Sequence, residues 1–195
     1  TSAEFLVNAN ESLAEASAFF REASTIIITL GTAWTFRFNA TGEIVSNCLK
    51  RDAKEFTRER LSLKTCSVLL NSLVGKYPQK RFIFTVSPIR HLKDGAHGNQ
   101  ISKSTLLMAV DSVVENHPDQ CVYFPAYEIM MDELRDYRFY AEDMVHPSQQ
   151  AVNYIWERFC DFALPETERA TLEKNRKAFL QSQHRIITRP QNTDK

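Results

Sequence analysis

Three short apolar runs, separated by long segments with helical spacing, constrain the fold of this chain more than any other feature. The runs are residues 26–30, 81–86 and 121–124. They are rich in β-branched and aromatic residues, and each stops at a glycine, a Ser-Pro pair or a proline, as buried strands often do. Alternating helices and strands favour a mainly parallel sheet. We therefore predict an α/β fold, a three-layer sandwich with a mainly parallel sheet.

Helices are expected before and between these strands. Apolar residues recur at helical spacing over 3–23, which predicts an amphipathic helix that covers a core. Ser62 stands where it can cap a helix over 62–76, and further helices are expected over 102–116 and 151–162. These segments supply the helical layers of the sandwich.

Two segments are expected to lie outside the main sheet. Residues 34–38 alternate in the manner of a strand, and residues 43–45 can return as the second strand of a hairpin. The polar and charged residues after position 164 predict a surface helix followed by a frayed end. We therefore divide the chain into one domain over 1–164 and a charged C-terminal helix and tail over 165–195.

The composition argues against a nucleic-acid or membrane partner. Lys and Arg together number 24, and Asp and Glu also number 24, so the formal net charge is zero and a neutral substrate is favoured. The longest apolar runs, 25–30 and 68–74, are far shorter than the roughly 20 residues of a membrane span. No signal-peptide pattern is present, which favours the cytoplasm, and a start at Thr1 instead of methionine suggests that upstream sequence has been lost.

The cysteines do not form a metal or disulfide pattern. Cys48, Cys66, Cys121 and Cys160 are widely spaced, and no C-x-x-C pair occurs. We predict that they are reduced thiols, mostly packed in the interior. No cofactor is predicted.

The sharpest chemical feature is an aspartate three residues before a histidine, Asp143 and His146, followed by Pro147. A general-base imidazole must be held in one tautomer, and a carboxylate that accepts its N–H does this and stabilises the imidazolium. Pro147 would fix the helix start and thereby the position of His146. The alternative is a surface helix cap. The place of the pair, after three strands and before the last core helix, favours the catalytic interpretation.

A second D-x-x-H spacing, Asp94 to His97, lies in a glycine-rich segment. Glycine-rich loops position a base poorly, so we expect His97 to be exposed and not catalytic. The histidines and aspartates at 91, 94, 97, 143 and 146 could in principle hold a metal. No H-E-x-x-H or similar ligand motif supports this, so no metal site is predicted.

The segment after the second strand is expected to be a substrate-binding loop that begins at Ser87. Its polar side chains can offer several donors to a polar or anionic ligand, although a solvated loop is the alternative. Ser87 itself is a poor nucleophile candidate, because Pro88 follows it and no G-x-S-x-G is present. The candidate ligand-binding residues are Arg90, His91, Asn99, Gln100 and Lys103.

Five ordered blocks carry a resemblance to a known family. They are residues 29–34, 46–50, 84–91, 123–128 and 143–148. Together they resemble the GSCFA-domain family, which is similar to the SGNH hydrolases, and they cover most of 25–162. The resemblance implies an SGNH/flavodoxin-like sandwich and places Asp143 and His146 in the final D-x-x-H block. It implies that residues 1–164 are the C-terminal portion of such a hydrolase domain.

Further roles are implied by the same resemblance. Gly31 corresponds to a strand-end oxyanion position, and the side-chain amide of Asn47 is a further candidate oxyanion donor. Leu49 stands where the family pattern has a histidine. The serine block that names the family is absent here, and the resemblance places it upstream of residue 1.

The function expected from the sequence is therefore hydrolysis of an ester, for example an O-acyl group on a carbohydrate or lipid-linked polymer. The mechanism would use a serine nucleophile with His146 and Asp143. Residues 1–195 alone would then have little activity, because the upstream serine is missing from them. The alternatives are a non-catalytic module of the same fold that binds a polar ligand, and a metal-dependent hydrolase. The oligomeric state is not predicted.

Overall fold

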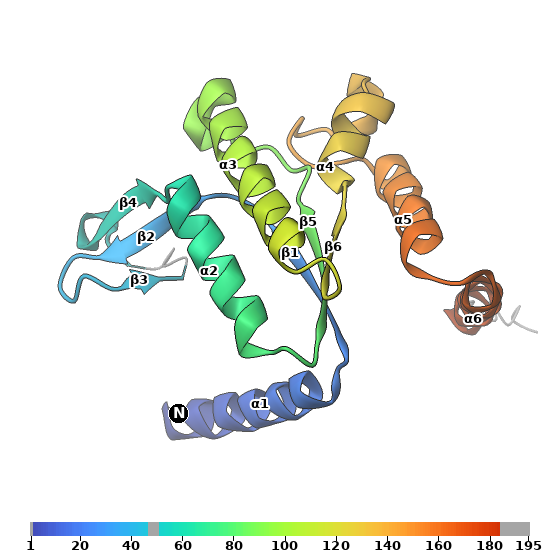
Figure 1. Cartoon of the computed structure of the whole chain (residues 1–195), viewed down its shortest axis with the longest axis horizontal. Coiled ribbons are helices and arrows are strands. Elements are labelled where there is room, and N and C mark those ends of the chain that lie inside the picture. Colours follow the sequence, from blue (N-terminus) through green and yellow to red (C-terminus); the bar gives the residue numbers. More distant parts are fainter. Residues whose placement is uncertain (1, 47–50, 184–195) are drawn as a thin grey trace, which may run out of the picture. The chain divides into compact units, whose positions relative to one another are not determined.

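The computed structural model describes residues 2–46 and 51–183 (Figure 1). The chain divides into two compact units, residues 1–151 and residues 152–195. All strands and the residues discussed as a site lie in the first unit. The boundary expected at residues 164 and 165 from the sequence stays a prediction.

The centre of the first unit is a parallel sheet of three strands. Its order is β1 (Thr25–Leu30), β5 (Arg81–Val86) and β6 (Cys121–Phe124), with β5 in the middle. Ile26 pairs with Phe82, and Phe82 pairs with Cys121, so the three strands end at the same edge. The sheet and the six α-helices of the described residues confirm an α/β fold with a parallel sheet. The three-layer arrangement stays a prediction.

Helices α2 (Leu63–Lys76) and α3 (Gly95–Asn116) pack on one face of this sheet (Figure 1). Ser62 caps α2 as predicted, because its side chain accepts the N–H of Thr65 at 3.1 Å. Phe82 and Phe84 of β5 point into the interface and are almost fully buried. They form one core cluster with Val74, Val110, Val113 and Cys121.

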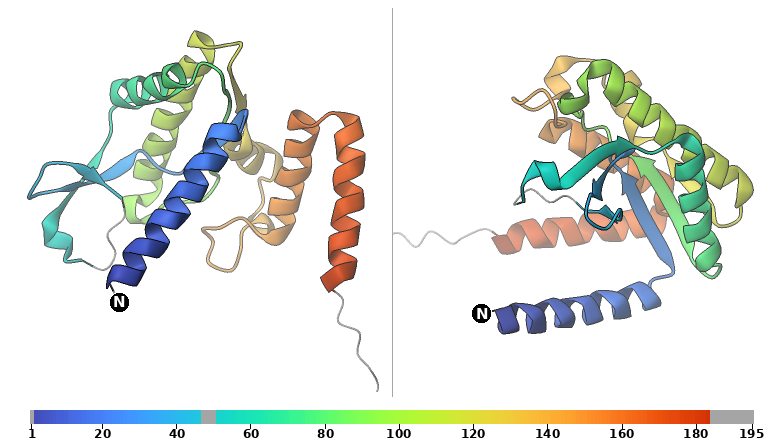
Figure 2. Two further views of the ribbon diagram at one scale, coloured as in Figure 1. Left: turned by 90° about the horizontal axis from the view of Figure 1, so that it is seen from below. Right: turned by 90° about the vertical axis from the view of Figure 1, so that its left-hand side faces the viewer.

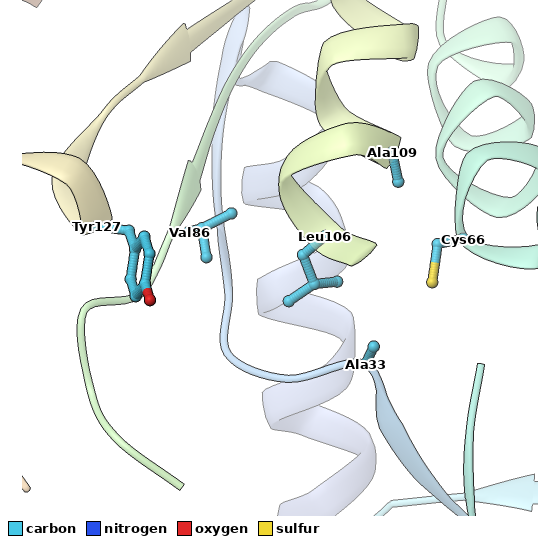
Figure 3. Close-up of a cluster of buried hydrophobic side chains, with 6 residues drawn as sticks. All are labelled: Ala33, Cys66, Val86, Leu106, Ala109 and Tyr127. Atoms are coloured by element: carbon cyan, nitrogen blue, oxygen red, sulfur yellow. The ribbon is translucent and has the colours of Figure 1, made fainter. Parts of the chain in front are cut away.

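A second core cluster lies closer to the carboxyl edge of the sheet (Figure 3). It joins Val86 at the end of β5 to Leu106 and Ala109 of α3, and it also contains Tyr127 and Cys66. This cluster fixes α3 against the strand ends, where the candidate site lies.

Strand β1 is less buried than its apolar sequence suggested. No residue of β1 is buried, and the side chain of Ile27 is 55% exposed. The prediction of a buried strand was wrong because β1 is an edge strand, and only its alternate residues Ile26, Ile28 and Leu30 pack on the core.

A second sheet of three antiparallel strands follows β1. The predicted hairpin is present as β2 (Trp34–Phe38) and β3 (Ile44–Val45), and β4 (Phe56–Arg60) pairs with the other side of β2. Strand β4 was not predicted from the sequence, because three of its five residues are charged. Its side chains are held by cross-strand contacts, including the guanidinium of Arg58 over the ring of Trp34.

Helix α1 (Ser2–Glu22) precedes β1, and its last turn lies beside the start of that strand (Figure 2). The buried ammonium of Lys80 donates to the carbonyls of Phe20, Arg21 and Ala23, at 2.7, 3.2 and 2.5 Å. A lysine at this place satisfies carbonyls that have no partner within the helix. No described residue of α1 is buried, so the role of a core cover stays a prediction.

Helix α3 begins seven residues earlier than the sequence predicted. The segment that contains Gly95 and Gly98 is its first turn and not part of a loop. Gly95 has a φ of +64°, and the buried carboxylate of Asp94 before it forms a 2.5 Å ion pair with Arg58 of β4. This tertiary contact holds the helix start although two glycines disfavour it.

The segment after β6 is helical and then irregular. Pro125 is followed by α4 (Ala126–Glu128), by a π-helical turn (Ile129–Glu133) and by a 3-10 turn (Tyr137–Phe139). Helices α5 (Gln149–Ala163) and α6 (Glu166–Gln183) complete the described chain, as the sequence predicted. Among residues 2–46 and 51–183, no helix combines the length and apolarity needed to cross a membrane.

The prediction of reduced, packed thiols is confirmed for three of the four cysteines. Cys66, Cys121 and Cys160 are buried and carry free thiols, and burial raises the pKa of each thiol. Cys48 lies outside the described residues.

Candidate active site

A buried lysine organises the carboxyl edge of the parallel sheet. Lys103 of α3 is 1% exposed, and its ammonium donates to the carbonyl oxygen of Gly31 and to that of Ser87, each at 2.6 Å. These two carbonyls follow the ends of β1 and β5. Lys103 therefore joins the two strand ends. The prediction that it belongs to a substrate loop was wrong, because it is a buried residue within helix α3.

The charge of Lys103 is retained near neutral pH. Burial lowers the pKa of its ammonium to about 8, because a charged group loses hydration in the interior. Two carbonyl acceptors at short distance compensate part of this loss. A positive charge thus lies directly beneath the carboxyl edge.

His91 shares the Gly31 carbonyl with Lys103. Its Nε2 lies 3.2 Å from Gly31 O, and because a carbonyl only accepts, Nε2 carries the proton. Burial, followed by the nearby charge of Lys103, lowers the pKa of His91. The side chain of Asn99 accepts the backbone N–H of His91 at 3.0 Å and orients this residue. In the neutral form of His91, this geometry leaves Nδ1 as an acceptor.

Ser102 is a structural residue of the same edge. Its Oγ accepts the N–H of Ala33 at 2.8 Å and lies 3.0 Å from Oγ1 of Thr32. Ser102 is 1% exposed, so it fixes the turn after β1 and is not accessible to a substrate. This role of Ser102 was not predicted, since a serine within a helix carries no pattern of its own.

Asp143 and His146 form the pair that the sequence predicted. Oδ2 of Asp143 lies 2.6 Å from Nδ1 of His146, while Oδ1 accepts the N–H groups of Val145 and His146, both at 2.9 Å. Met144 between them has a φ of 59°, which closes the loop tightly. The arrangement orients the ring and leaves Nε2 as the nitrogen that can take a proton. Both side chains are about half exposed, at 48% and 58%.

The pKa of Asp143 is expected to be measurably low. The backbone N–H groups of His146 and Val145, and then the His146 side chain, lower this pKa from 3.8 to about 2. The carboxylate therefore stabilises the loop fully above pH 4, and this contribution is lost as the pH falls through about 2. A ¹³C NMR titration of the carboxyl carbon should show the low midpoint, and His146→Ala should retain most of the shift. A midpoint near 3.8 in the folded protein would contradict this geometry.

Arg90 connects this loop to the sheet edge. Its backbone N–H donates to the carbonyl of Val145 at 3.2 Å, and its Nη1 donates to that of Met144 at 3.3 Å. The guanidinium lies 3.8 Å from the ring centroid of Tyr140. The backbone of Ala141 also donates to His146 O at 2.8 Å. The Asp143–His146 loop is thus fixed to the chain that leaves β5.

Arg90 lines two adjoining cavities. The first, of about 330 Å³, is lined by both polar and apolar groups. Its residues are Arg90, His91, Leu92, Gly95, Ala96, Asn99, Gln100, Tyr127, Met131 and Tyr137. The second, of about 310 Å³, shares Arg90, Met131 and Tyr137 with the first. We call the first cavity the Arg90 pocket.

The structure brings most of the predicted site residues to one region. Arg90, His91, Asn99 and Gln100 line the Arg90 pocket. Gly31 lies beside it, but the atom held there is its carbonyl oxygen, so an oxyanion role for Gly31 stays a prediction. Asn47 lies outside the described residues.

The competing aspartate and histidine do not form a pair. His97 is exposed, as predicted, whereas Asp94 is buried against Arg58. Across residues 2–46 and 51–183, no three His, Cys, Asp or Glu side chains gather in a group that could hold a metal ion.

A parallel sheet with a cavity of mixed polar and apolar lining and an Asp-His pair near its carboxyl edge defines an α/β domain with a candidate acid-base site. The profile of the GSCFA family matches residues 1–159. The chain belongs to the GSCFA family. No curated protein and no solved structure matched the chain.

Proposed function

We propose that this chain is part of an SGNH-type hydrolase with a flavodoxin-like three-layer sandwich, which cleaves an ester by a Ser-His-Asp mechanism. The observation that carries the proposal is the geometry of the pair. Nδ1 of His146 lies 2.6 Å from one oxygen of Asp143, and two backbone N–H groups hold the other oxygen. A general base is oriented in this way in acyl transfer.

In the proposed reaction, Nε2 of His146 takes the proton of a serine hydroxyl as the serine oxygen attacks the ester carbonyl. Asp143 stabilises the resulting imidazolium. The imidazolium then returns the proton to the departing alcohol, which leaves an acyl-serine. His146 next removes a proton from water as the water oxygen attacks the acyl-serine. The bond to the serine oxygen then breaks, the imidazolium returns the proton to that oxygen, and the acid is released.

The attacking serine is proposed to precede residue 1, as the family resemblance implies. The serines at the sheet edge are poor candidates. Ser102 is buried and bonded to Ala33. The side chain of Ser87 lies 3.4 Å from the N–H of Ile89, within its own Ser-Pro turn. Ser148 accepts the N–H of Ala151 at the start of α5.

The Arg90 pocket is the proposed place for the substrate. Its volume of about 330 Å³ and its mixed polar and aromatic lining suit a small polar group, such as part of an acylated carbohydrate. Lys103 and His91 hold the strand ends at its base.

The proposal is tested by labelling the full-length protein with a fluorophosphonate and locating the adduct by mass spectrometry. We expect one labelled serine, and we expect His146→Ala to abolish labelling because the serine is no longer deprotonated. His97→Ala is the matched control and should label like the wild type, since His97 is exposed and outside the pair. Labelling that survives His146→Ala, or labelling of Ser87, would contradict the proposal.

The second candidate is a non-catalytic module that binds a polar ligand. The Arg90 pocket is the observation that favours it, because the polar groups converge there without the Asp143–His146 pair in the lining. This candidate predicts ligand binding without any serine adduct in the full-length protein.

A further inference from the structure

The side chains that line the Arg90 pocket include one positive charge, that of Arg90, and no negative charge. The lining contains one arginine, one histidine and two amides, but no aspartate or glutamate. The nearby Asp94 is neutralised by Arg58 at 2.5 Å. The buried ammonium of Lys103 lies 5.9 Å from the ring of Tyr127, which lines the pocket. The local field is therefore positive.

Arg90 has no carboxylate partner among residues 2–46 and 51–183. Its guanidinium lies 3.8 Å from the ring centroid of Tyr140, is hydrogen-bonded to the Tyr140 side chain, and donates through Nη1 to the carbonyl of Met144. Stacking on an aromatic ring fixes the plane of a guanidinium and leaves its edge N–H groups available. Those N–H groups suit a group with two acceptor oxygens, such as a carboxylate or a phosphate.

The two amides of the pocket present donors as well. The oxygen of Asn99 accepts the N–H of His91, and the oxygen of Gln100 accepts the hydroxyl of Tyr127. The amide nitrogens are therefore the groups left to meet a ligand. Donors from Arg90, Asn99 and Gln100 thus surround one cavity.

We infer that the Arg90 pocket binds an anionic group of the substrate, a carboxylate or a phosphate. This group would be attached to the alcohol part of the ester, from which the acyl group is removed. This inference rests on the proposed function for its link to catalysis, but not for the binding itself. It narrows the substrate to an acidic or phosphorylated ester, in contrast to the neutral substrate that the overall charge favoured.

Binding can be measured by calorimetry on the full-length protein at low salt, with three probes of similar size. Methyl β-D-glucuronide carries a carboxylate, glycerol 3-phosphate carries a phosphate, and methyl β-D-glucoside is neutral. We expect at least one anionic probe to bind about tenfold or more tightly than the glucoside. The preferred anion shows which group the pocket selects. Equal binding of all three probes, or tighter binding of the glucoside, would overturn the inference.

Two substitutions test the residues. Arg90→Gln should weaken binding of the preferred anion about 10- to 100-fold. Gln100→Glu keeps an acceptor for the Tyr127 hydroxyl but adds a negative charge. It should therefore weaken binding of the preferred anion and leave binding of the glucoside unchanged. Gln100 is exposed, so this second variant remains informative if the Arg90 variant does not fold.

Arg138→Gln is the matched control. Arg138 is 71% exposed in the 3-10 turn Tyr137–Phe139 and lines neither cavity, so its loss should not change binding. An effect equal to that of Arg90→Gln would overturn the assignment to the pocket. Serine labelling without anion binding would refute this inference alone, whereas anion binding without labelling would refute only the proposed hydrolase.

Discussion

Replacement of Asp143 by asparagine is expected to lower kcat for the proposed ester hydrolysis by about 10³- to 10⁴-fold in the full-length protein. Asparagine can still accept the N–H groups of Val145 and His146 through its oxygen, so the loop should keep its shape. Its amide nitrogen cannot accept from Nδ1 of His146. The imidazole would then adopt the wrong tautomer, with the proton on Nε2.

The measurement is steady-state hydrolysis of a chromogenic acetyl ester as a function of pH. Glu142→Gln is the matched control, because it removes an exposed carboxylate directly beside Asp143 in the sequence. The control should retain wild-type kcat. A kcat for Asp143→Asn within about tenfold of the wild type would mean that the pair is a surface helix cap and not an acid-base pair.

The second large effect is on stability. Phe84→Ala should lower the free energy of unfolding by about 3–5 kcal/mol, the usual cost of removing a buried aromatic ring. Phe84 is 0% exposed in the middle strand, and it packs with Val74 of α2 and Val110 of α3. Neighbours on three elements cannot collapse easily into the space, so a cavity remains.

Urea unfolding monitored by circular dichroism measures this effect. Phe5→Ala removes the same ring from a side chain that is 71% exposed on α1, and it should change stability by less than about 0.5 kcal/mol. A loss below about 1 kcal/mol for Phe84→Ala would mean that β5 is not the centre of the core.

The main sheet could be predicted because each of its strands carries a local pattern. The run over 81–86 is apolar and is bounded by polar residues, and Ser62 stands one residue before α2. These features act within a few residues of one another, so they are visible without the fold.

Other elements depend on contacts that are distant in the sequence. Strand β4 is mostly charged, and it is a strand because Arg58 stacks on Trp34 and pairs with Asp94. The same pair starts α3 at Gly95, within a segment whose glycines suggested a loop. Local propensity was outweighed in both places by tertiary contacts.

The candidate site also contains residues that a local pattern predicts and residues whose position depends on distant contacts. The Asp143–His146 pair spans three residues, and its hydrogen bonds are nearly all internal to that loop, so the sequence alone predicted it. Lys103 was assigned wrongly, because its partners Gly31 and Ser87 are 72 and 16 residues away.

By itself, the sequence determined the α/β class, the three parallel strands, the family and the pairing of Asp143 with His146, since each rests on short-range patterns or ordered blocks. Only the tertiary structure decided that Lys103 is buried beneath the strand ends and that Arg90 lines two cavities without a carboxylate partner in the described part of the chain. Burial and local charge arise where distant segments meet, and no single segment encodes them.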